Sequence, residues 1–179
     1  MVNRCLVTKF FLIINFVITL FATSHALADY GVNLALGRQM GREPEMNRYS
    51  FIKTLDVKWY ETSNSYLTVY LDFSFLYWHA TMQDDIQGAS FNPSFRYVWL
   101  KQNNHYFVDF GIGVARLSDV TFQKRNLGSN WLFEDKFAIG INFNGKHEIA
   151  LLAIHYSNGS TNINNEGTNM AAISYSYYF

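Results

Sequence analysis

The chain has 179 residues and no formal net charge at pH 7, and it is rich in aromatic residues, with 16 Phe and 12 Tyr. This length is that of a single domain. The charge balance argues against nucleic acid as a partner, because it shows no basic excess.

The first 28 residues have the pattern of a secretory signal peptide. Arg4 and Lys9 lie in its basic start, residues 10–22 form an apolar run, and Ala-Leu-Ala at 26–28 offers a cleavage site. A retained membrane helix is the alternative, but the run is shorter than the roughly 20 residues that such a helix needs. We therefore expect cleavage after Ala28.

Cleavage would remove Cys5, the only cysteine. Residues 29–179 would then form no disulfide and carry no cysteine nucleophile or thiolate metal site. Loss of the two basic residues also leaves a slight acidic excess. Cys5 precedes the apolar run and is therefore too early to be a lipoprotein cysteine.

The remaining chain shows apolar and polar residues in strict alternation, which predicts β-strands. The clearest case is Tyr66–Tyr77, where Leu67, Val69, Leu71, Phe73, Phe75 and Tyr77 share one face. In 106–115, small and polar residues alternate with apolar ones and suit the narrow interior of a small barrel. The same rhythm predicts eight strands, near residues 30–38, 50–60, 66–79, 90–100, 105–116, 131–143, 147–157 and 169–179.

The predicted connections alternate in length. Those at 61–65, 101–104 and 144–146 are short, whereas those at 39–49, 80–89, 117–130 and 158–168 are long. Short periplasmic turns and long extracellular loops are typical of a bacterial outer-membrane protein. We therefore predict an all-β fold, an eight-stranded antiparallel transmembrane β-barrel over residues 29–179, located in the Gram-negative outer membrane. A soluble sandwich or lipocalin-like barrel is the alternative, but it would not leave so many aromatics on its outer surface.

The last residues, Ile173 to Phe179, place aromatics at alternate positions and end in Phe. Such an end resembles the signal that the outer-membrane assembly machinery reads. It also predicts that the odd-numbered positions of the last strand face lipid.

Among chemical motifs, the sequence has no P-loop, no GxSxG turn and no His and carboxylate cluster at metal-ligand spacing. His155 and Ser157 are two apart in a predicted strand and so share a face, the lipid-facing one, at its outer edge. Asn169 has matching parity in the next strand, and antiparallel pairing brings it beside them. A histidine can activate a serine as nucleophile, although a His-x-Ser pair also arises by chance.

Around this segment the chain resembles the lipid A 3-O-deacylases, the PagL family. The match consists of His155-Tyr156-Ser157-Asn158-Gly159, of Asn165-Glu166-Gly167 and of a last strand ending in aromatics. The resemblance implies an esterase that releases the 3-hydroxyacyl chain from lipid A, the lipid anchor of lipopolysaccharide in the outer leaflet. It implies Ser157 as nucleophile, His155 as base, and Asn158 with the Gly159 amide as the oxyanion hole. No metal or cofactor is implied, and a homodimer is compatible with the resemblance.

One departure concerns the third member of the catalytic group. The family pattern has a glutamate where this chain has Asn169, and asparagine can orient an imidazole without supplying charge. Glu166, three residues earlier in the loop, is the alternative. Arg125, with Lys124, is a candidate contact to lipid A phosphates. The competing functions are a non-enzymatic barrel, such as an adhesin or structural protein, and another lipid A acyl-modifying enzyme, such as a palmitoyltransferase.

Overall fold

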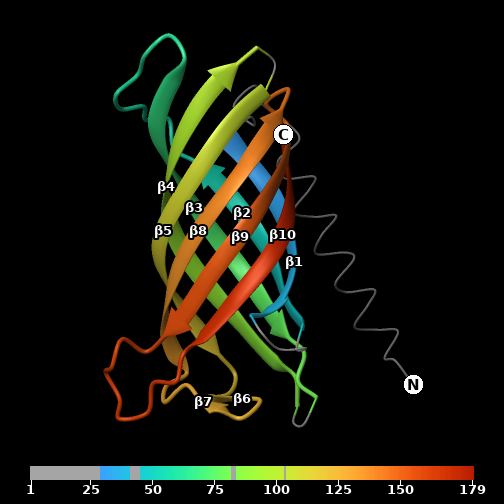
Figure 1. Cartoon of the computed structure of the whole chain (residues 1–179), viewed down its shortest axis with the longest axis vertical. Coiled ribbons are helices and arrows are strands. Elements are labelled where there is room, and N and C mark those ends of the chain that lie inside the picture. The colour runs from blue at the N-terminus through green and yellow to red at the C-terminus, as the bar shows by residue number, and fades with distance from the viewer. Residues whose placement is uncertain (1–28, 41–44, 82–83, 103) are drawn as a thin grey trace, which may run out of the picture.

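The computed structural model describes residues 29–40, 45–81, 84–102 and 104–179, so the predicted signal peptide, residues 1–28, lies outside the described residues. The described chain is a closed antiparallel barrel with the strand order β1-β10-β9-β8-β5-β4-β3-β2, as Figure 1 shows. Its strands are β1 (Tyr30–Gln39), β2 (Glu45–Thr54), β3 (Ser65–Trp78), β4 (Ile86–Lys101), β5 (Asn104–Leu117), β8 (Trp131–Phe143), β9 (His147–Ser157) and β10 (Thr168–Tyr178). The predicted eight-stranded barrel is confirmed.

Two parts of the prediction were wrong. The second strand runs over Glu45–Thr54 instead of 50–60, because Met46 and Arg48 pair with β3 and fill the interior. After Thr54 the regular pairing with β3 ends, and only isolated hydrogen bonds continue it, from Leu55 to Val69 and between Trp59 and Leu67. The predicted long loop 117–130 contains a small hairpin formed by β6 (Thr121–Phe122) and β7 (Arg125–Asn126). Because the second strand lies earlier, the connection before it, predicted as long at 39–49, spans only residues 40–44, and the periplasmic connection after it, predicted as short at 61–65, spans residues 55–64.

Alternation along each strand separates a lipid-type outer face from the interior. In β3, Phe73 and Phe75 point outward and are about half exposed, at 49% and 47%, while Asp72 and Ser74 are buried inside. Phe95, Phe110 and Ile139 continue the exposed apolar face on β4, β5 and β8. A wall of exposed apolar side chains around the barrel is what a bilayer requires. No helix in the described ranges is long and apolar enough to cross a membrane.

The middle of the interior is held by ion pairs. Arg48 lies 2.7 Å from Glu134 and 3.0 Å from Asp72, and Lys136 lies 2.5 Å from Asp72, with all four side chains almost fully buried. Nearer the end with the C-terminus, Arg96 pairs with two acids, Asp109 at 2.8 Å and Glu148 at 2.7 Å. These pairs neutralise charges that would be costly to bury alone.

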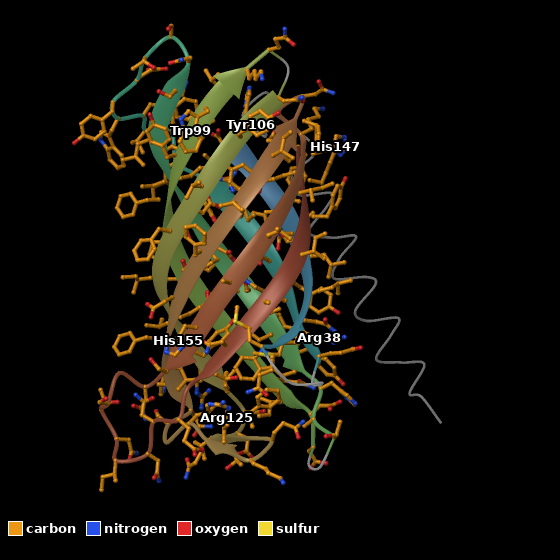
Figure 2. The ribbon with its side chains drawn as sticks, viewed as in Figure 1. Arg38, Trp99, Tyr106, Arg125, His147 and His155 are labelled. Carbon is orange, nitrogen blue, oxygen red and sulfur yellow. The ribbon has the colours of Figure 1, made fainter. Side chains whose placement is uncertain are left out.

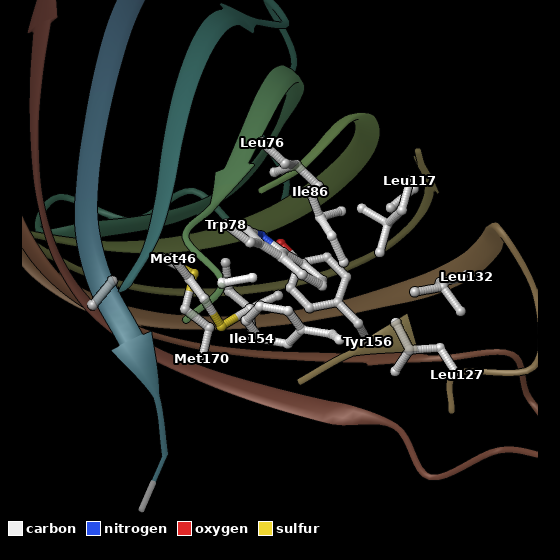
Figure 3. Packing of buried hydrophobic residues seen from close by; sticks show 14 of the residues in the cluster. Met46, Leu76, Trp78, Ile86, Leu117, Leu127, Leu132, Ile154, Tyr156 and Met170 are labelled. Atoms are coloured by element: carbon white, nitrogen blue, oxygen red, sulfur yellow. The ribbon is translucent and has the colours of Figure 1, made fainter. Parts of the chain in front are cut away.

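The opposite end of the barrel is filled by an apolar plug. Trp78 packs against Tyr156 and Phe122, with ring centroids 4.9 and 5.0 Å apart, and Figure 3 shows the side chains around them. Phe122 belongs to β6 and Leu127 follows β7, and both are completely buried. The hairpin segment 118–130 therefore closes the barrel mouth next to the end of β9. The chain ends at the other end of the barrel (Figure 1), which is the periplasmic end in this class of barrel.

Candidate active site

His155 and Ser157 lie together on the outer face at the loop end of β9. The odd-numbered residues of this strand point outward, and His155 is exposed. Figure 2 shows His155 where the barrel wall meets the loops, above Arg125. The shared outward face predicted for this pair is confirmed.

Asn169 on β10 stands directly opposite His155 and bonds to its ring. The two residues are register partners, and Nδ1 of His155 lies 2.7 Å from Oδ1 of Asn169. An amide oxygen can only accept, so Nδ1 carries the hydrogen and donates it. The other ring nitrogen, Nε2, keeps its lone pair and is the one that can take a proton.

The Ser157 hydroxyl makes no hydrogen bond to another described residue. Its register partner on β8 is Phe133, an exposed ring on the same face. Ser157 is partly buried beside this ring. The hydroxyl is thus available to a lipid that approaches along the wall, two positions from the imidazole.

Asn158 and Gly159, predicted to bind an oxyanion, differ in what their donors do. Asn158 points inward and is 1% exposed, and its Nδ2 donates to the carbonyl oxygens of Leu127 at 2.9 Å and Asn164 at 2.6 Å. Its backbone N–H donates to Oδ1 of Asn165 at 3.0 Å. In this arrangement Asn158 holds two loops together. The backbone N–H of Gly159 meets no acceptor among the described residues, and its φ of +61° turns the chain over the Phe133 ring.

The loop before β10 packs against the histidine. Gly167 has a φ of +52°, and a Cβ added there would lie 3.1 Å from Cε1 of His155. Arg125 in β7 donates Nη1 to the carbonyl oxygens of Glu166 at 2.9 Å and Gly167 at 3.1 Å. The Glu166 carboxylate accepts the backbone N–H of Asn126, also in β7. Glu166 is therefore engaged with the hairpin, and Asn169 is the residue bonded to His155.

Asp135 on β8 lies beside this site and was not predicted from the sequence. It is the register partner of His155 on the side away from Asn169. Its signal was available in the sequence, as a charged residue at an odd position between Phe133 and Phe137. The described ranges contain no group of three or more His, Cys, Asp or Glu side chains placed to hold a metal ion.

A groove of about 620 Å³ lies on the same wall as the site. Its floor includes Ala171, the next outward residue after Asn169 on β10, and its sides include Leu36, Leu151 and Ile173. Small residues on β10 between larger apolar ones on its neighbours create this hollow. Arg38 stands at its edge, at a height along the barrel similar to that of His155 (Figure 2).

The fold and the site define a membrane-type β-barrel with a serine, a histidine and an asparagine on its lipid-facing wall. Residues 48–178 match the family model described as lipid A 3-O-deacylase (PagL). The chain belongs to this family.

Individual relatives agree with this assignment. The chain is 35% identical over 123 residues to the lipid A deacylase PagL of Pseudomonas aeruginosa, covering 67% of this chain and 70% of that protein. It is 29% identical over 91 residues to the lipid A deacylase PagL of Bordetella bronchiseptica, covering 51% of this chain and 49% of that protein. The crystal structure of the outer membrane enzyme PagL superposes with a TM-score of 0.77 at 31% identity, covering 82% of this chain and 98% of that one.

Proposed function

We propose that this protein is an outer-membrane lipid A 3-O-deacylase, which hydrolyses the ester of the 3-hydroxyacyl chain at the 3 position of lipid A. The observation that carries the proposal is the hydrogen bond between His155 and Asn169 on the outer wall, with Ser157 on the same face. A site in this place is accessible to a lipid that already lies in the outer leaflet. Family membership supports the reaction and the substrate.

In the proposed reaction, Nε2 of His155 takes the proton of the Ser157 hydroxyl as its oxygen attacks the ester carbonyl carbon. The backbone N–H of Gly159 donates to the oxyanion that develops. The imidazolium then gives its proton to the leaving sugar hydroxyl, and an acyl group remains on Ser157. Water then attacks the acyl carbon as the same imidazole takes one of its protons, and the imidazolium returns that proton to Ser157 as the 3-hydroxy fatty acid leaves. The side chain of Asn158 donates to the oxyanion only if its Nδ2 gives up one of its hydrogen bonds to the carbonyl oxygens of Leu127 and Asn164.

For the third member we propose Asn169, with Glu166 as the alternative. Asn169 already bonds to Nδ1 and fixes the ring and its tautomer. For Glu166 to take this role, its carboxylate would have to leave the backbone N–H of Asn126. All of the proposed groups come from one chain, so the mechanism does not depend on a homodimer.

The groove beside the site supports a substrate with long apolar chains. Leu36, Leu151 and Ile173 line it with apolar side chains, and Arg38, Glu45 and Asn47 add polar ones. Its floor at Ala171 is the next outward position after Asn169 on the membrane-facing wall. An acyl chain lying between Leu36 and Ile173 would stay in a hydrocarbon-like environment while its ester reaches Ser157.

Export by a cleaved signal peptide, residues 1–28, and recognition of Phe179 by the assembly machinery also belong to the proposal.

Mass spectrometry of lipid A from Gram-negative cells with and without this protein tests the function. We expect lipid A to lose one 3-hydroxyacyl group when the protein is present. A gain of palmitate would instead indicate an acyltransferase, and an unchanged lipid A with folded protein in the outer membrane would indicate a non-enzymatic barrel. In the same cells, Asn169→Ala should slow deacylation far more than Glu166→Ala, and the reverse order would make Glu166 the third member.

A further inference from the structure

A carboxylate, that of Asp135, stands beside His155 on the outer wall. Asp135 is paired in register with His155 on β9 and with Ile112 on β5. Along β8 its outward neighbours are Phe133 and Phe137, both close to half exposed. Three of its four neighbours on the outer face are therefore apolar, and the fourth is the histidine of the proposed site.

The Asp135 side chain takes no part in the ion pairs that hold the barrel interior together. The interior acids all have cationic partners, as with Asp72 and Glu134 near Arg48. Asp135, by contrast, forms no hydrogen bond or ion pair with another described residue. A carboxylate among apolar side chains at a membrane surface gains most from a nearby cation. On this face, the adjacent group that can become a cation is the His155 ring.

The residue bonded to the His155 ring supplies no charge. Asn169 orients the ring through Nδ1, but its amide is neutral and cannot balance an imidazolium. Directly opposed residues in an antiparallel pair have Cβ atoms about 5 Å apart. The Asp135 carboxylate therefore lies within strong electrostatic range of the ring on the side away from Asn169.

We propose that Asp135 is a positioning residue that supplies the negative charge stabilising protonated His155, while Asn169 fixes the ring orientation. This inference rests on the proposed function. When the Ser157 proton moves to Nε2, the ring becomes a cation, and Asp135 remains ionised and takes no proton. The ring later passes that proton to the leaving hydroxyl, so the charge on Asp135 is the same before and after each turnover.

Removal of the charge with little change in shape tests the proposal. In purified protein acting on lipid A in neutral detergent, Asp135→Asn should lower kcat about 10- to 100-fold with KM nearly unchanged. The acidic limb of the activity profile should move to lower pH, because the other outward group beside the ring, Asn169, does not titrate. Asp84→Asn is the matched control, since Asp84 is an exposed acid in the connection between β3 and β4, across the barrel from β9. It should leave kcat and the profile unchanged.

Returning the charge on the other side of the ring gives the sharper result. In the Asp135→Asn background, Asn169→Glu should recover most of the lost kcat and return the acidic limb toward its original pH. Full activity of Asp135→Asn, a loss confined to KM, or a kcat loss that Asn169→Glu does not recover would overturn the inference.

The two proposals fail in different ways. Inactive wild-type protein would refute the proposed function. In active protein, full kcat of Asp135→Asn would refute only the role of Asp135 and leave the proposed function standing.

Discussion

Gly167 gives the most specific prediction about how the loop before β10 shapes the site. Its φ of +52° lies in the left-handed region, where a side chain costs about 1 kcal/mol. A Cβ would also lie 3.1 Å from Cε1 of His155 and 3.2 Å from the carbonyl oxygen of Tyr156. Both distances are shorter than ordinary contact, so in Gly167→Ala the ring must move by a few tenths of an ångström.

That movement should reduce activity more than stability. A misplacement of about 1 Å can cost on the order of 100-fold in rate, so a smaller one should cost about 10-fold. Gly145→Ala is the matched control, because Gly145 has a φ of +72° with no atom within 4 Å of the added Cβ. It introduces similar backbone strain in a turn far from the site.

Deacylation rate and urea unfolding in lipid vesicles, measured on both variants, separate the two effects. We expect a similar loss of about 1 kcal/mol in the free energy of unfolding for both, and a loss of activity only for Gly167→Ala. Equal activity of the two variants would refute the claim that Gly167 sets the position of the His155 ring.

Three further tests address the interior ion pairs, the loop beside the site and a loop across the barrel. Glu134→Ala removes a fully buried partner of Arg48 and should lower the free energy of unfolding, measured with urea, by about 3–5 kcal/mol. A decrease below about 1 kcal/mol would show that this ion pair does not stabilise the interior. Arg125→Ala removes the hydrogen bonds to the carbonyl oxygens of Glu166 and Gly167 and should lower kcat several-fold in the deacylation assay, whereas Lys124→Ala should leave it unchanged. Equal kcat values for the two variants would show that Arg125 does not hold the loop before β10 in place. The hydrogen bond from the Tyr77 hydroxyl lowers the pKa of the Asp85 carboxyl below its ordinary value of 3.8. The ionised carboxylate therefore stabilises its loop above pH 3.8, and this stabilisation is lost as the pH falls below that value and the carboxylate takes up a proton. NMR titration of the Asp85 carboxyl checks this, and a midpoint at or above 3.8 would contradict it.

Much of the barrel follows from period-two patterning. The strands at Trp131–Phe143 and His147–Ser157 begin and end at the predicted residues, because their alternation is unbroken and a tight turn at 144–146 joins them. The second strand was misplaced because Val57 and Trp59 continue an apolar alternation beyond β2, where the regular pairing with β3 has ended and both side chains remain exposed. Local pattern cannot tell an exposed extension from a strand of the wall.

The candidate site was predictable where parity decides it. The outward face of His155 and its pairing with Asn169 follow from the hairpin that joins β9 and β10. Alternation along β9 also places Asn158 on the inward face, where it is buried, although the family resemblance implied a role for it in the oxyanion hole. The contact of Arg125 with the loop before β10 depends on a hairpin of two-residue strands docked on the barrel mouth. Such a tertiary contact leaves no periodic signal.

The central claim is that Ser157, facing lipid beside His155, is the nucleophile. Its most direct measurement is the release of 3-hydroxy fatty acid from lipid A by purified Ser157→Ala, compared with wild type and with Ser160→Ala, an exposed serine three residues further along. We predict that Ser157→Ala releases none while keeping the heat-modifiable migration of a folded barrel, and that Ser160→Ala matches wild type. Release at the wild-type rate by folded Ser157→Ala would contradict the account.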